Sequence, residues 1–280
     1  MKSEYVLGIS CFYHDSAAAL IKDGKIIAAV HEERFTRKKH DSRFPLRSIN
    51  YCLEEAQIEL NDLDSIVYYD NPMVTLERII SNQISVYPDG EELWNNVVNR
   101  WTQTKLRIID FLRNIMEEDF KGDVVISDHH LSHAASAFYP SPFEESAILT
   151  VDGVGEWATA SIGRGHDEKI EMLSKLEYPN SLGLLYSAFT YYTGFRVNGG
   201  EYKLMGLAPY GKPRFVDKIK TNLLEIRRDG SISLNHKYFG YLEGMRMTNE
   251  NFNELFGAPP RKEESKITQR EMDLARSIQV

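Results

Sequence analysis

The sequence predicts an α/β protein of two related lobes, because the same succession of strands occurs twice along its 280 residues. Each occurrence consists of three short apolar runs bounded by turn residues, a pattern typical of strands. Helical patterns follow both sets of strands, so we expect two lobes, each with its own sheet, and a cleft between them. The six runs are Tyr5 to Ser10, Ala17 to Ile21, Lys25 to Val30, Ala147 to Val151, Trp157 to Gly163 and Ile170 to Leu176.

The other elements follow from turn residues and periodicity. Lys22-Asp23-Gly24 joins two apolar runs, and Asp-Gly is a frequent hairpin turn. Further strands are expected over Ser65 to Tyr69, Asp123 to Ile126 and Ser231 to Leu234. Helical spacing predicts helices over Arg47 to Leu60, Glu91 to Glu118 (one or two), His129 to Phe138, Ser181 to Tyr192, Phe215 to Ile226 and Gln269 to Val280. Glycine and proline predict a loop over Arg196 to Pro213, and Lys237 to Glu264 is polar with weak periodicity.

This duplicated arrangement is typical of the actin-like fold, which actin, sugar kinases and Hsp70 share and which belongs to the ribonuclease-H-like type. We place the first lobe at residues 1–144 and the second at 145–280, with an insertion around 196–265. The second lobe is expected to be incomplete, since its last helix ends the sequence without a cap. In this fold the first turn of each lobe binds phosphate through backbone amides, so Gly153 and Gly155 are candidate nucleotide-binding residues.

Composition restricts the class of protein. The net charge is −8, from 33 basic and 41 acidic residues, which argues against a broad nucleic-acid-binding surface. Cys11 and Cys52 give no disulfide framework and fit a reducing compartment. No signal peptide is apparent, and no apolar run approaches the roughly 20 residues that span a bilayer. We therefore expect a cytoplasmic globular protein with neither a membrane nor a nucleic acid as partner.

A pair of histidines predicts a metal site. His129 and His133 are four residues apart on an expected helix, so both imidazoles project from one face. Two neutral imidazoles in this arrangement can chelate a divalent transition metal. Asp152 follows an apolar run in a glycine-rich turn and could add a carboxylate oxygen, which leaves coordination positions open for a ligand. The alternative is that these histidines only satisfy local packing.

Further candidate residues lie in polar loops. His14, after the first strand, has a side chain suited to act as a general base, whereas a Ser-His-Asp hydrolase is disfavoured because adjacent residues point in different directions. Arg37 and Lys39 stand in a charged run that could hold a phosphate, although such runs are usually solvated surface.

The stretch Gly206 to Pro213 resembles a phosphate-binding P-loop but fails as one. Pro213 replaces the serine or threonine that would bind magnesium, and Pro209 removes a backbone amide. Gly206 could still let the backbone approach a ligand, and Lys203 adds an ammonium group to the same segment.

Together these segments resemble the NodU/CmcH family of O-carbamoyltransferases, which modify nodulation factors and antibiotics. The resemblance spans most of the chain in the family's order but not a whole family member, since those are about twice as long. The matching motifs are His14-Asp15-Ser16-Ala17-Ala18-Ala19, His31-Glu32-Glu33-Arg34-Phe35, Arg37-Lys38-Lys39-His40-Asp41, His129-His130-Leu131-Ser132-His133-Ala134, Val151-Asp152-Gly153 and Tyr202-Lys203-Leu204-Met205-Gly206-Leu207-Ala208-Pro209-Tyr210-Gly211.

The resemblance implies a reaction and its partners. A YrdC-like C-terminal domain, which this chain lacks, makes carbamoyl-adenylate from carbamoyl phosphate and ATP. The actin-like part then transfers the carbamoyl group to a hydroxyl of a small-molecule or sugar acceptor. A further aspartate ligand and the rest of the nucleotide pocket are expected beyond Val280, so the chain resembles an N-terminal part. Association into a homodimer is left as an open alternative.

The resemblance also implies roles for individual residues. His129, His133 and Asp152 match ligands of a metal site, with Fe²⁺ the first choice and Zn²⁺ the second. His14 matches a general base. Lys39, Arg37 or Lys203 could stabilise the phosphate of the departing AMP.

Two other functions fit the same fold. One is a sugar kinase, which would need no histidine pair and no carbamoyl phosphate. The other is a non-catalytic nucleotide-binding module, in which the histidines would be dispensable.

Overall fold

The computed structural model describes residues 3–103, 105–115 and 120–280 as a mixed α/β protein. The contacts divide the chain into two compact units. Unit 1 comprises Met1–Glu77 and Val97–Ser132, and unit 2 comprises Arg78–Asn96 and His133–Val280. Helix α6 (His129–Phe138) runs across the division, whereas the expected lobe boundary at residue 144 lies after this helix.

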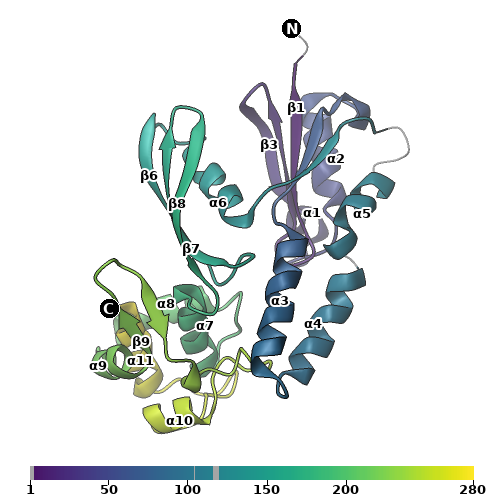
Figure 1. The fold of residues 1–280 in the computed structure, drawn as a ribbon. Helices are drawn as coiled ribbons and strands as arrows, with labels where there is room; N and C mark the ends of the chain where they lie inside the picture. Colours follow the sequence, from purple (N-terminus) through teal and green to yellow (C-terminus); the bar gives the residue numbers. More distant parts are fainter. Residues whose placement is uncertain (1–2, 104, 116–119) are drawn as a thin grey trace. The chain divides into compact units, whose positions relative to one another are not determined.

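Unit 1 contains a five-stranded sheet in the order β3-β2-β1-β4-β5 (Figure 1). The strands are β1 (Tyr5–Ser10), β2 (Ala17–Lys22), β3 (Lys25–His31), β4 (Ser65–Tyr68) and β5 (Asp123–Ile126). The first three form an antiparallel meander, and β4 and β5 continue the sheet parallel to β1. Because the carboxyl ends of β1, β4 and β5 share one edge, the residues that follow these strands gather there.

The helices of unit 1 cover this sheet and shape its edge. Helix α2 (Leu46–Ala56) packs on β2 and β3, and Glu32 caps it by accepting hydrogen bonds from Ser48 N at 2.9 Å and Ser48 Oγ at 2.8 Å. The core holds Leu7, Leu20, Ile66, Tyr68 and Leu112, all fully buried. The other helices are α1 (Glu33–Thr36), η1 (Leu60–Asp62), η2 (Lys105–Arg107), α5 (Ile108–Ile115) and the parts of α3 (Pro72–Val86) and α4 (Glu91–Gln103) that belong to this unit.

Unit 2 contains a second antiparallel meander of β6 (Glu145–Val151), β7 (Ala158–His166) and β8 (Lys169–Glu177). Helix α6 packs on it through Ala134 and Phe138, which contact Ile148. Gly165 makes this packing close, because a Cβ there would lie 2.4 Å from the Phe138 ring. The position of α6 on the meander therefore depends on a side chain being absent.

The rest of unit 2 forms a mainly helical core. Its largest buried side chains include Phe189, Tyr192, Phe239 and Phe252. The last helix, α11 (Gln269–Gln279), begins with a capping box in which Thr268 and Glu271 bond to each other's backbone amides. The elements are α7 (Leu182–Tyr192), α8 (Glu201–Leu207), η3 (Ala208–Tyr210), α9 (Val216–Asn222), β9 (Leu224–Ile226), β10 (Ile232–Leu234), η4 (His236–Tyr238), α10 (Glu250–Phe256) and α11 (Gln269–Gln279).

Two expectations about these elements are wrong, and one long helix was missed. The predicted loop over Arg196 to Pro213 contains α8 and η3, because Leu204 and Leu207 pack into the core despite the flanking glycine and proline. The helix predicted to reach Ile226 ends at Asn222, and a strand follows it. Helix α3 was not predicted at all. The end of the helices expected up to Glu118 lies outside the described residues.

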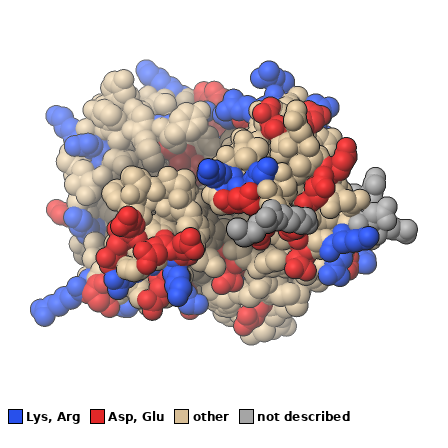
Figure 2. Space-filling view, turned by 90° about the horizontal axis from the view of Figure 1, so that it is seen from above, with Lys and Arg blue, Asp and Glu red and all other residues tan. Residues whose placement is uncertain are grey.

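Two surface properties bear on the expected partners. None of the helices in the described ranges is long and apolar enough to cross a membrane. Lys and Arg side chains lie beside Asp and Glu over the face seen in Figure 2, so charges of both signs are mixed there.

The segment 196–265, expected as an insertion, supplies Phe239 and Phe252 to the core of unit 2. Its status as an insertion stays a prediction.

Candidate active site

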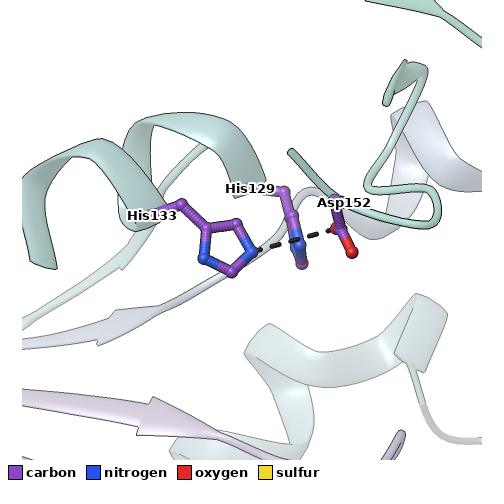
Figure 3. Close-up of side chains that lie close together, drawn as sticks. All are labelled: His129, His133 and Asp152. Carbon is purple, nitrogen blue, oxygen red and sulfur yellow. Dashed lines mark ion pairs between the residues drawn. The ribbon is translucent and has the colours of Figure 1, made fainter. Parts of the chain in front are cut away.

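The predicted metal ligands come together. His129, His133 and Asp152 each offer one ligand atom, and these atoms lie within 4.8 Å of one another. Figure 3 shows both imidazoles projecting from α6 toward the carboxylate, which comes from the turn after β6. His133 Nε2 lies 3.8 Å from Asp152 Oδ2. The helical spacing and the packing of α6 on β6 together produce this cluster.

Local contacts fix the orientation of Asp152. Its Oδ1 accepts a hydrogen bond from Gly153 N at 2.6 Å, which leaves Oδ2 toward His133. Ser181, the N-cap of α7, donates its hydroxyl to the Gly153 carbonyl at 2.6 Å. Gly183 in the first turn of α7 permits this contact, because a Cβ there would lie 2.3 Å from the Asp152 carbonyl oxygen. The aspartate is thus held between a strand end and a helix start.

The donor set suits a divalent transition metal. Two imidazole nitrogens and a carboxylate oxygen are ligands that zinc and iron accept. Ligand atoms bound to one such ion lie about 3–3.5 Å apart, so a small rotation of the half-exposed His133 side chain is needed to close the set. These three residues therefore fit a metal ion.

His14 lies in a second cluster, in unit 1. Its Nδ1 is 3.0 Å from Asp15 Oδ2, and His40 Nδ1 is 2.9 Å from Asp15 Oδ1. A carboxylate only accepts hydrogen bonds, so both Nδ1 atoms carry the proton and the neutral His14 ring has its lone pair on Nε2. Burial raises the pKa of the Asp15 carboxyl, but the hydrogen bonds from His40 and His14 outweigh it and the net pKa is lowered.

This contact corrects one argument made from the sequence. Adjacent residues were expected to point apart, yet the His14 ring and the Asp15 carboxylate are within hydrogen-bond distance, a contact of the kind that also occurs in catalytic triads. The reason is the backbone of Asp15, whose φ of +46° turns the side chain back toward its neighbour. A serine nucleophile is not part of it: Ser16 is fully buried, and its Oγ bonds to no described residue.

Of the remaining candidates, Arg37, Lys39, Lys203 and Gly206 are exposed, whereas Gly153 is half-buried and Gly155 is buried. Arg37 and Lys39 follow α1 in unit 1, on the loop that brings His40 to Asp15. Lys203 and Gly206 lie on the solvent side of α8 in unit 2, and Gly153 and Gly155 lie in the turn after β6. A Cβ at Gly206 would meet nothing within 4 Å, so no packing contact requires glycine there.

Several residues of these surroundings were missed from the sequence. Asp15 and His40 stand in the quoted motifs, but the bond between adjacent residues depends on a positive φ that no pattern revealed. Asp70 and Lys105 form a buried ion pair at 3.5 Å near the ends of β1 and β4. Lys105 lies within a segment predicted as helical, and periodicity alone does not show that a lysine is buried.

The chain is similar in sequence to known proteins. An uncharacterized protein of Synechocystis sp. is 54% identical over 99% of this chain, which aligns with 46% of that protein. The nodulation protein NolNO of Sinorhizobium fredii is 41% identical over 72% of this chain and 28% of its own length. The chain thus spans less than half the length of either relative.

Structural likeness is weaker. YeaZ from Pseudomonas aeruginosa matches 61% of this chain and 65% of its own with a TM-score of 0.34 and 12% identity, too low to assign a fold.

A family model described as carbamoyltransferase N-terminus matches residues 5–280. With this match over nearly its whole length, the chain belongs to the carbamoyltransferase N-terminus family.

Proposed function

We propose that this chain is the N-terminal, actin-like part of an ATP-dependent O-carbamoyltransferase of the cytoplasm. The enzyme transfers a carbamoyl group from carbamoyl-adenylate, made from carbamoyl phosphate and ATP, to a hydroxyl of a small molecule or sugar. The observation that carries this proposal is the convergence of His129, His133 and Asp152 in a member of a carbamoyltransferase family. A sugar kinase or a nucleotide-binding module has no need of such a cluster.

The repeated meander supports the actin-like fold. Both units contain three consecutive antiparallel strands, and in unit 1 this meander continues into parallel strands. We assign adenylate formation, by a YrdC-like domain, to the part of the longer relatives that this chain does not match.

His14 is the proposed general base. The ionised Asp15 holds Nδ1–H, so Nε2 takes the proton from the acceptor hydroxyl. The acceptor oxygen then forms a bond to the carbamoyl carbon, and the bond from that carbon to the phosphate oxygen breaks. AMP leaves with the bonding electron pair, and Arg37, Lys39 or Lys203 offsets its charge.

His129, His133 and Asp152 would hold the metal, which supplies a Lewis acid for a carbonyl or phosphate oxygen. The half-buried carboxylate and the buried side of α6 keep part of this site from water. Gly206 leaves open space near its backbone for the nucleotide. Gly153 and Gly155 remain proposed nucleotide-binding residues, although their amides donate to Asp152 Oδ1 and to the Ala158 carbonyl.

A metal titration tests the site. The double variant His129→Ala, His133→Ala should lose at least about 100-fold in affinity for Fe²⁺ or Zn²⁺, measured by anaerobic calorimetry, because two of three ligands are gone. The control is His166→Ala, since this exposed histidine pairs with its neighbour Asp167. An unchanged affinity in the double variant would remove the assignment.

A transfer assay tests His14. In the full-length enzyme, His14→Ala should slow carbamoyl transfer from labelled carbamoyl phosphate by about 10²–10⁴-fold while adenylate formation persists. The control is the exposed His31→Ala. A transfer rate equal to that of the control would refute the role. Phosphorylation of a sugar without carbamoyl phosphate would instead favour the kinase.

A further inference from the structure

A lysine is buried among aromatic rings in unit 1. Lys105 is 4% exposed, and its Nζ lies 3.5 Å from Asp70 Oδ2 and 3.4 Å from Tyr69 Oη. The same Nζ lies 4.6 Å from the centroid of the Trp101 ring and 5.3 Å from that of Tyr13, and it approaches Tyr69 at the hydroxyl end, 5.8 Å from the ring centroid. The ammonium therefore contacts residues that follow both β1 and β4.

This arrangement is not what stability alone favours. A buried ion pair is often no more stable than apolar side chains of the same volume, because both charges lose their water. The pairing is also imperfect: Asp70 Oδ1 is buried and has no hydrogen-bond partner among the residues that the structure describes. Burial meanwhile raises the pKa of the neighbouring Cys11 thiol to about 12, as expected for a dry environment.

The two tyrosines around the ammonium lead to the two clusters of the site. Tyr13 precedes His14, and their ring centroids are 4.5 Å apart. The Tyr69 ring meets the His129 ring edge-on at 5.5 Å. The carbonyl of Tyr69 also accepts the Ser132 hydroxyl at 3.0 Å, which ties it to the first turns of α6.

We propose that Lys105, neutralised by Asp70, is a positioning residue that orients Tyr13 and Tyr69 and, through them, the rings of His14 and His129. The ammonium attracts the face of the Tyr13 ring and donates a hydrogen bond to the Tyr69 hydroxyl, so it sets the orientation of both side chains as well as their packing. An apolar side chain of equal volume would fill the space without directing the rings. The functional meaning of this role rests on the function proposed above.

The test separates the ammonium charge from the volume of the side chain. Lys105→Met keeps the length of the stem, and Arg107→Met on the same 3₁₀ helix is the exposed control. We expect Lys105→Met to lower metal affinity about 10-fold or more, as loss of a group supporting a ligand does, and Arg107→Met to leave it unchanged. In Lys105→Ala, n-propylammonium should restore affinity because it replaces the missing atoms, whereas 1-propanol, which lacks the charge, should not.

A second readout does not need the metal. In chain labelled with ¹³C at the histidine rings, Lys105→Met should shift the signals of His14 and His129 and leave those of His166 and His236 in place. If the wild type binds no metal, the proposed function fails, and these signals alone decide the inference.

Two results would overturn the inference. One is a folded Lys105→Met variant with unchanged metal affinity, or with unchanged His14 and His129 signals. The other applies if that variant does not fold: Asp70→Asn, which keeps the volume and removes the counter-charge, must then shift the same signals, and wild-type values would refute the role.

Discussion

Gly206 allows a substitution whose effects on stability and on binding should have opposite signs. It lies near the end of α8, its φ is not positive, and a Cβ would meet nothing within 4 Å. Glycine inside a helix is about 1 kcal/mol less favourable than alanine. Gly206→Ala should therefore stabilise the chain by about 0.5–1 kcal/mol, which raises Tm by about 1–3 °C for a protein of this size.

Binding should change in the other direction. If the nucleotide approaches the backbone at Gly206, the added methyl group occupies part of that space, and the affinity for AMP or ATP should fall several-fold. Urea denaturation measures the first effect, and calorimetry measures the second on the same sample. A variant that is more stable and binds the nucleotide as the wild type does would show that Gly206 is not at the nucleotide site.

Gly211 is a matched control in the same segment. A Cβ there would lie 1.9 Å from the carbonyl oxygen of Met272 in α11, so the backbone itself must move. Gly211→Ala should cost about 1–3 kcal/mol or more. If Gly206→Ala also destabilised the chain, the argument from open space and helix propensity would be refuted.

Two other changes have a defined sign. Asp41 is fully buried and accepts two side-chain hydrogen bonds from Arg43, which hold the pKa of its carboxyl well below the usual range. Asp41→Asn should cost about 2 kcal/mol at pH 7. That difference should shrink as pH falls below about 4, because the wild-type contribution is present above the unfolded pKa and lost on protonation. Asp110→Asn, in an exposed pair, is the control; a difference that persists in acid would contradict the assignment. Gly165→Ala should lower the free energy of unfolding by about 1–3 kcal/mol and weaken metal binding, since the methyl group pushes Phe138 and α6 away from the sheet. Thermal denaturation and a metal titration would measure the two losses. An unchanged metal affinity would mean that the ligand positions do not depend on the close packing of α6 at Gly165.

The sequence predicted elements best where burial and periodicity agree. The bounds of β1, β5 and α6 match the prediction residue for residue, because each is a short apolar or amphipathic stretch between polar turns. The prediction failed at α8, where glycine and proline outweighed the signal of two buried leucines. Local propensity there is overridden by packing against the core of unit 2.

The candidate site, too, was predictable only in part. The spacing of His129 and His133 was sufficient to bring them together, since a helix repeats every 3.6 residues or so. The Asp15 contact to His14 depends on one backbone angle, and the burial of Lys105 depends on how a 3₁₀ helix packs against strand ends. Both are consequences of tertiary structure, for which the sequence holds no local pattern.

The close approach of α7 to the Asp152 turn restricts how this sequence can vary. Any side chain at position 183 would collide with the backbone that holds Asp152, and Ser181 anchors the same turn. The two segments therefore form one linked signature. Its first part is an aspartate followed by a glycine, and its second part, about thirty residues later, is a serine two positions before a glycine. Searches that require both halves should recognise distant members of the family even where the intervening strands have diverged.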